Sequence, residues 1–247
     1  MNSFHTVCDD FYVNLNLNTE MELPRSREGV LHYFEQFRKR YPTMRNFYSR
    51  ERSEFMLEEE KAGGNYRWTT VEPRRLLAGQ VNPTTPADAF ELHRLALDLA
   101  PHTLSLSTLD CESLNLIFGF DYVYRGNHNQ LIAEALGLPP AYEKLAEAEG
   151  TKLVGYEPSF QFTCDEDCRI VGRISFETRT TLQHIRTGEF PEEQFSVYLT
   201  GRRYGSLDAG ETFVSAYDQI AEFCQRLLSD FVLDNVLRPV QQAIVIK

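Results

Sequence analysis

The segment from Leu114 to Tyr124, LNLIFGFDYVY, constrains the fold more than any other part of the chain, because apolar or aromatic side chains occupy every second position. Strict alternation over this length predicts a β-strand with one buried face. A second alternating segment, FYVNLNLN from Phe11 to Asn18, sets apolar residues against three asparagines and a tyrosine. Such strands need a layer of other elements over their apolar face.

Four segments show helical periodicity instead: residues 27–41, 86–101, 128–136 and 211–237. The second has the clearest start, because Thr85 occupies the N-cap position, Pro86 the first helical position and Asp88 the third, which is close to a capping box. The last carries a wide apolar stripe, which is typical of a helix lying across a sheet. Pro239 is predicted to end it, and residues 240–247 are predicted to add an edge strand.

Further strands are predicted at residues 45–81, 152–163, 168–181 and 194–204. Because strands follow one another with helices between only some of them, the pattern favours an α+β protein over a doubly wound parallel sheet. We expect antiparallel β-sheets covered by helices, with a long C-terminal helix packed across the second sheet. The expected halves are residues 1–150 and 151–247, which either pack as one domain or form two. A distant duplication is conceivable, although no residue-level repeat supports it.

The composition limits the class of protein and its partners. Hydrophobic residues make up 42% of the 247 residues, enough for a substantial core, and the formal net charge of −11 disfavours a nucleic-acid partner. The N-terminus has neither the basic start nor the apolar core of a secretory signal, and no apolar run approaches the ~20 residues needed to span a bilayer. We therefore expect a cytoplasmic protein without membrane or nucleic-acid partners, either monomeric or forming a homo-oligomer.

The stretch TCDEDCR at 163–169 raises the question of a metal site. Alternating residues on both sides predict that it is the connection of a β-hairpin, with Cys164 and Cys168 flanking the turn. A metal cluster of these thiols with His184 lacks the usual ligand spacing, and a cross-strand disulfide is the other alternative. We expect neither a metal nor a cofactor.

A candidate anion-binding site follows the strongest strand, in the sequence RGNHNQL. Gly126 permits a tight turn into a helix whose first N–H groups, together with Arg125, Asn127 and His128, resemble an anion site in their chemistry. We expect His128 to stay neutral there. The alternative is an ordinary connection in which Asn127 caps the helix. Asp121 lies about 13 Å from Arg125 along extended chain, too far for a direct acid–base pair.

A candidate interaction surface lies on the strands YSRERSEF and YRWTTVEPRR. Its residues are arginines and an aromatic side chain of the kinds enriched in protein interfaces: Arg50, Arg52, Arg67, Trp68 and Arg74. The alternative is a solvated face with cross-strand ion pairs to neighbouring glutamates.

Three classes of function remain. A non-catalytic protein-interaction or scaffold protein fits best, because none of the common catalytic motifs occurs. A small-molecule or anion-binding protein with a pocket between sheet and helices is the alternative. An enzyme of unrecognised type is third, with Arg125, His128 and Asp121 as its least unfavourable site. The protein or small molecule bound is not identified by the sequence.

Overall fold

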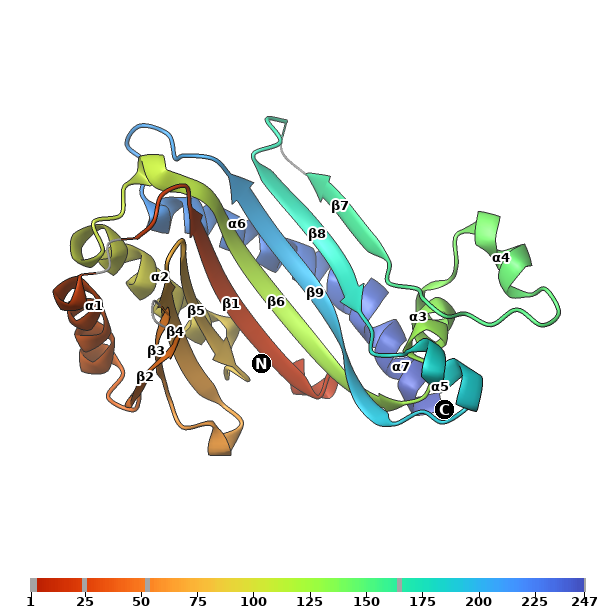
Figure 1. Ribbon diagram of the computed structural model, residues 1–247. Coiled ribbons are helices and arrows are strands. Elements are labelled where there is room, and N and C mark those ends of the chain that lie inside the picture. The colour runs from red at the N-terminus through yellow and green to blue at the C-terminus, as the bar shows by residue number, and fades with distance from the viewer. Residues whose placement is uncertain (1–3, 24–25, 52–53, 164–165, 247) are drawn as a thin grey trace.

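The computed structural model describes residues 4–23, 26–51, 54–163 and 166–246. Its centre is a nine-stranded antiparallel sheet with the strand order β2-β3-β4-β5-β1-β6-β9-β8-β7 (Figure 1). The predicted α+β class and antiparallel pairing are confirmed. β1 (Asp10–Thr19) pairs with β6 (Cys111–Arg125), and β6 pairs with β9 (Glu192–Tyr204). Strands from both expected parts, residues 1–150 and 151–247, therefore join in one sheet.

By the order of their elements, residues 10–103 and residues 111–246 form two similarly arranged structural halves, which begin with β1 and β6. The first continues with α1 (Arg27–Arg40), β2 (Asn46–Glu51), β3 (Glu54–Glu58), β4 (Tyr66–Glu72), β5 (Arg75–Val81) and α2 (Pro86–Thr103). The second continues from β6 with α3 (His128–Leu136), α4 (Pro140–Ala146), β7 (Ser159–Thr163), β8 (Ile170–Glu177), α5 (Leu182–Thr187), β9 (Glu192–Tyr204) and α6 (Phe213–Leu227). In each half the first strand pairs with the last strand of the meander, β1 with β5 and β6 with β9, and a long helix follows.

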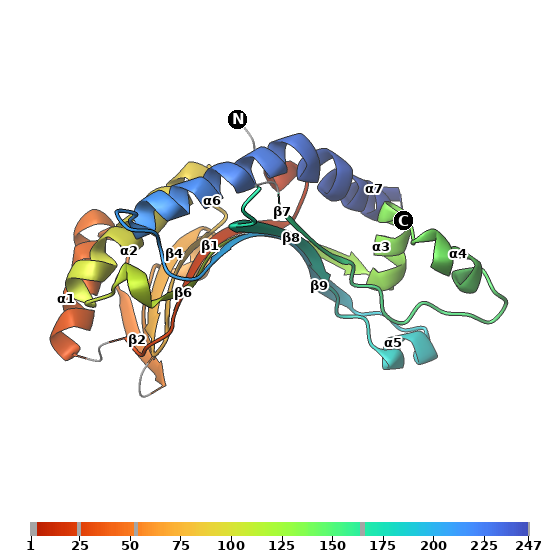
Figure 2. The same ribbon diagram turned by 90° about the horizontal axis from the view of Figure 1, so that it is seen from above.

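The core lies between the sheet and the helices. Figure 2 shows an arched sheet with α1, α2, α6 and the C-terminal helix α7 (Arg238–Ile246) along its convex side. The apolar residues predicted to alternate in β1 and β6 are buried on that side, among them Phe11, Leu15, Leu116 and Phe118. Helix α2 begins as predicted, since the Asp88 carboxylate accepts a hydrogen bond of 2.9 Å from the backbone N–H of Thr85.

The C-terminal segment differs from its prediction. Helix α6 runs on through a π-helical segment (Leu228–Leu237) into α7 (Arg238–Ile246), so Pro239 does not end the helix and no edge strand forms over 240–246. Pro239 is the second residue of α7 and directly follows the π-helical segment, so the helix changes its hydrogen-bonding pattern just before the proline and continues past it. Val240 is buried, and α7 packs against α3, so tertiary packing outweighs the β-forming tendency of these residues.

Among the described residues, the structure contains no helix with the length and apolar character that crossing a bilayer requires.

Candidate functional site

The concave face of the sheet carries the polar half of the strand alternation. No helix of the described chain crosses this face over the central strands (Figure 2). Because side chains alternate along a strand, residues paired across strands lie on the same face. Asn14 on β1 pairs with Gly79 on β5 and Ile117 on β6, and the row continues through Thr200 and Arg173. The face therefore forms a continuous, largely polar surface.

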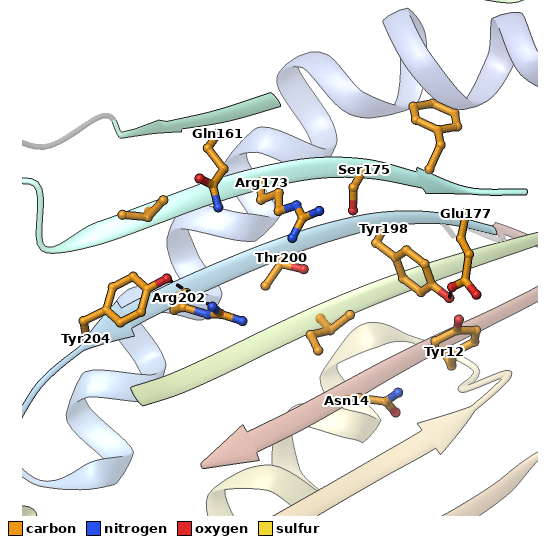
Figure 3. Close-up of a pocket in the computed structure, with 13 residues that line it drawn as sticks. Tyr12, Asn14, Gln161, Arg173, Ser175, Glu177, Tyr198, Thr200, Arg202 and Tyr204 are labelled. Carbon is orange, nitrogen blue, oxygen red and sulfur yellow. Dashed lines mark hydrogen bonds between the residues drawn. The ribbon is translucent and has the colours of Figure 1, made fainter. Parts of the chain in front are cut away.

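Two adjoining hollows lie on this face. The central hollow has a volume of about 530 Å³ and is lined by Tyr12, Asn14, Ile117, Gln161, Val171, Arg173, Ser175, Phe176, Glu177, Tyr198, Thr200, Arg202 and Tyr204 (Figure 3). The second hollow, of about 570 Å³, lies over β3, β4, β5 and β1, and its walls include Trp68, Tyr66 and Glu58. The hollows meet at Tyr12 and Asn14, which line both.

One end of the central hollow is a cluster of tyrosines and carboxylates. The Tyr198 hydroxyl donates to Glu177 Oε2 at 2.9 Å, and the Tyr12 hydroxyl donates to Asp121 Oδ1 at 3.4 Å. Burial raises the pKa of Tyr12, and also that of Tyr198. Burial, with a smaller contribution from the neighbouring Asp10 charge, raises the pKa of Asp121. The tyrosines are therefore protonated hydrogen-bond donors at neutral pH.

The opposite end of the central hollow holds two arginines, Arg173 on β8 and Arg202 on β9. Arg202 donates from Nε to Asn115 Oδ1 and from Nη1 to the Tyr204 hydroxyl at 3.0 Å, with its guanidinium carbon 5.4 Å from the Tyr204 ring centroid. Arg173 donates from Nε to Ser159 Oγ at 3.0 Å. Within the described part of the chain, neither guanidinium pairs with a carboxylate.

Unpaired oxygens add acceptors to the same face. Asn14 Oδ1, Asn16 Oδ1 and Thr70 Oγ1 are buried atoms that find no hydrogen-bond donor among the residues that the structure describes. Because a buried polar atom without a partner is costly, such groups mark places where a ligand or water completes the hydrogen bonding. All three residues alternate with residues that point into the helix-covered core, as the pairing of β1 with β5 and of β5 with β4 requires.

The predicted anion site at the start of α3 is built mainly from contacts within the protein. Asn127 caps the helix, accepting from the backbone N–H groups of Asn129 and Gln130, and the N–H of His128 donates to Thr180 Oγ1 at 2.9 Å. His128 is buried, and burial lowers its pKa. Arg125 is exposed at the end of β6. Anion binding by Arg125, Asn127 and His128 remains a prediction, but the first three helical N–H groups already have acceptors.

A further hollow of about 610 Å³ lies beside this turn, between α3, α4 and α5. Its charged lining residues are Glu134, Glu143, Glu147 and Lys152. The excess of carboxylates makes this hollow less favourable to an anion than the arginine end of the concave face.

The residues of the predicted interaction surface do not all share one face. Trp68 lies on the concave face, whereas its neighbour Arg67 points to the helix side, where it pairs with Glu59 at 3.1 Å and lies over the Tyr41 ring. Arg50 lines the second hollow with Trp68, and Arg74 is exposed in the turn between β4 and β5. Arg52 lies outside the described residues.

The stretch around the two cysteines joins β7 to β8, as predicted for a hairpin. Cys164 lies outside the described residues, and Cys168 is an exposed free thiol with a left-handed backbone, φ 53°. The His184 N–H and ring take part in the cap of α5. Over the described ranges, no three histidine, cysteine, aspartate or glutamate residues gather as metal ligands would.

The sequence interpretation did not single out Arg173 and Arg202. A signal for Arg202 is present, because polar residues alternate in VYLTGRRY at Tyr198, Thr200, Arg202 and Tyr204 as they do in β1. That Arg173 lies beside them depends on the pairing of β8 with β9.

Comparison with known proteins adds no family assignment. No protein-family model matches the chain. A search of curated proteins also gives no significant match.

Proposed function

We propose that this chain is a non-catalytic protein-binding module that holds a protein partner against the concave face of its sheet. The observation that carries the proposal is the uncovered polar face itself, across which tyrosine, tryptophan and arginine side chains are distributed over both halves of the chain. These residue types are enriched where proteins bind one another, because they combine large contact area with hydrogen-bonding groups.

The shape of the face favours a protein over a small molecule. A small-molecule pocket usually encloses most of its ligand and is predominantly apolar. Here the two hollows adjoin at Tyr12 and Asn14 and lie on a surface that the helices leave uncovered (Figures 2 and 3). A partner that covers both hollows would also bring donors to Asn14 and Thr70, which line them and whose side-chain oxygens have no partner among the described residues.

The groups that line the hollows are suited to binding. The lining residues of the described chain include no cysteine and no histidine. Tyr12 and Tyr198 stay protonated because burial raises the pKa of each, so they donate hydrogen bonds to carboxylates and do not act as bases at neutral pH.

A test places one bulky charged side chain in the centre of the face. Thr200 lies between Ile117 and Arg173 in the central row of the concave face. The lysine side chain of Thr200→Lys would therefore obstruct a partner that lies against the middle of this face. The matched control is Ser229→Lys, an exposed position on the π-helical segment. Both variants are first checked for unchanged thermal unfolding.

The decisive measurement combines affinity capture with a reconstituted complex. We expect the original chain and the Ser229→Lys variant to bind a purified partner that the Thr200→Lys variant does not bind. In the complex, hydrogen exchange should be slowed on β1, β6 and β9. Protection confined to the helices, retention by the Thr200 variant, or failure to isolate any partner would each count against the proposal. A second copy of this chain as the captured partner would be recognised by sedimentation and would make the face a self-association surface.

A further inference from the structure

The arginine pair, Arg173 and Arg202, differs from other arginines that this fold holds by ion pairs. Arg203, which follows Arg202 in the sequence, points to the opposite face of β9. It forms two hydrogen bonds to the Glu211 carboxylate, of 2.8 and 2.7 Å. Arg202 and Arg173 find no carboxylate among the described residues, although acidic residues outnumber basic ones by 36 to 25. The two charges of the arginine pair are thus left available.

The pairing of β8 with β9 brings both arginine residues to the lining of the same hollow. Arg173 pairs with Thr200, and Thr200 and Arg202 are successive residues on the same face of β9. Diagonal neighbours of this kind lie about 7–8 Å apart at the backbone, within the reach of two long side chains. Figure 3 shows Arg173, Thr200, Arg202 and Gln161 arranged around the same end of the central hollow.

The structure also orients the arginine pair. Asn115 and the Tyr204 ring and hydroxyl hold Arg202, while Ser159 holds the Nε end of Arg173. The Nη groups of Arg173 and Nη2 of Arg202 have no acceptor among the described residues. Pre-oriented side chains lose less conformational entropy when a ligand binds, so these N–H groups are ready to donate to an oxyanion.

We propose that Arg173 and Arg202 form an oxyanion subsite that binds a phosphoryl or carboxylate group, with Thr200 and Gln161 as neutral donors. A planar guanidinium donates in parallel to two oxygens of either group. The net charge of −11 repels anions at long range, so affinity must come from this local cluster. The inference rests on the proposed function only for the source of the anion, which would be a side chain or modification of the bound partner.

The test uses inorganic phosphate and, in a second arm, N-acetylglutamate, each titrated into the full chain at constant ionic strength and followed by NMR. The variant is Arg173→Gln with Arg202→Gln. The control is Arg186→Gln with Arg226→Gln, which makes the same change in net charge at exposed positions of α5 and α6. Should the glutamine variant unfold, Arg173→Lys with Arg202→Lys replaces it, since lysine keeps the charge and loses the planar fork.

We expect saturable binding of at least one probe, equal in the original chain and the control, with the shifted amides on β8 and β9. The Kd should rise at least tenfold in the glutamine variant and by a smaller, measurable factor in the lysine variant. Preference between the probes identifies the anion as phosphoryl or carboxylate. The inference is overturned if neither probe saturates or if the substitutions leave the Kd unchanged.

The two proposals fail separately. A partner captured equally by the original chain and by the Arg173→Gln, Arg202→Gln variant, yet lost by Thr200→Lys, would preserve the binding face and remove the oxyanion subsite. Saturable phosphate binding that depends on the arginine pair, without any protein partner, would preserve the subsite and remove the protein-binding proposal.

Discussion

Replacing Glu211 with glutamine tests how the connection between β9 and α6 is held. The Glu211 carboxylate accepts hydrogen bonds from both Nη groups of Arg203, which is only 4% exposed. It also accepts a hydrogen bond of 3.0 Å from the backbone N–H of Asp208. The Arg203 guanidinium lowers the pKa of the Glu211 carboxyl from 4.5 to about 2. Glu211→Gln would leave the buried guanidinium beside a neutral amide.

The size of the pKa shift gives the expected change in the free energy of unfolding. At about 1.4 kcal/mol for each pKa unit, the lowered pKa corresponds to roughly 3 kcal/mol of stability when fully expressed. The Glu211 side chain is 19% exposed and Asp208 remains 3.8 Å from Arg203, so part of the effect is lost to solvent screening and compensation. We expect Glu211→Gln to lower the free energy of unfolding by about 2 kcal/mol near neutral pH, or the Tm by about 4–8 °C.

The pH dependence distinguishes the ion pair from lost packing. Because the folded-state pKa lies below the unfolded one, the stabilisation is complete above pH 4.5 and is lost as the pH falls through 4.5 toward 2. Urea unfolding across this range should therefore show the difference between the original chain and the variant shrinking toward zero. Glu222→Gln, an exposed position on α6, is the control and should change stability by less than about 0.5 kcal/mol. Equal unfolding free energies for the original chain and Glu211→Gln near pH 7 would refute the reasoning.

Three further outcomes follow from other contacts. Gly119→Ala should destabilise the fold by about 1–3 kcal/mol in urea unfolding, since its Cβ would lie 2.1 Å from the Tyr12 ring; a change below about 0.5 kcal/mol would contradict this. Thr212→Ala should cost about 1 kcal/mol in the same assay, because its hydroxyl caps α6, and an unchanged midpoint would argue against the cap. Brief thiol labelling of the native protein, mapped by mass spectrometry, should modify exposed Cys168 and spare Cys224, where burial raises the pKa to about 12; the reverse order would be inconsistent with the packing of α6.

The sequence predicted elements whose signals are local. Alternation marked β1 and β6, because one face of each strand meets the core and the other does not. The capping interaction of Asp88 at the start of α2 could also be predicted, because it joins residues only three positions apart. The continuation past Pro239 was not readable, because it depends on the burial of Val240 beneath elements distant in sequence.

By itself the sequence determined an α+β protein with antiparallel strands, each having an apolar and a polar side, and a long C-terminal helix. The joining of the two structural halves through the β1–β6 pair was decided by the tertiary structure, as was the placement of Arg173 and Arg202 in the lining of one hollow. The physical reason is that a strand's side-chain alternation is encoded within a few residues, whereas its partners and register depend on hydrogen bonds between segments far apart in the chain. The candidate site lies on the polar faces that alternation predicts, and only the order of the strands assembles those faces into one surface.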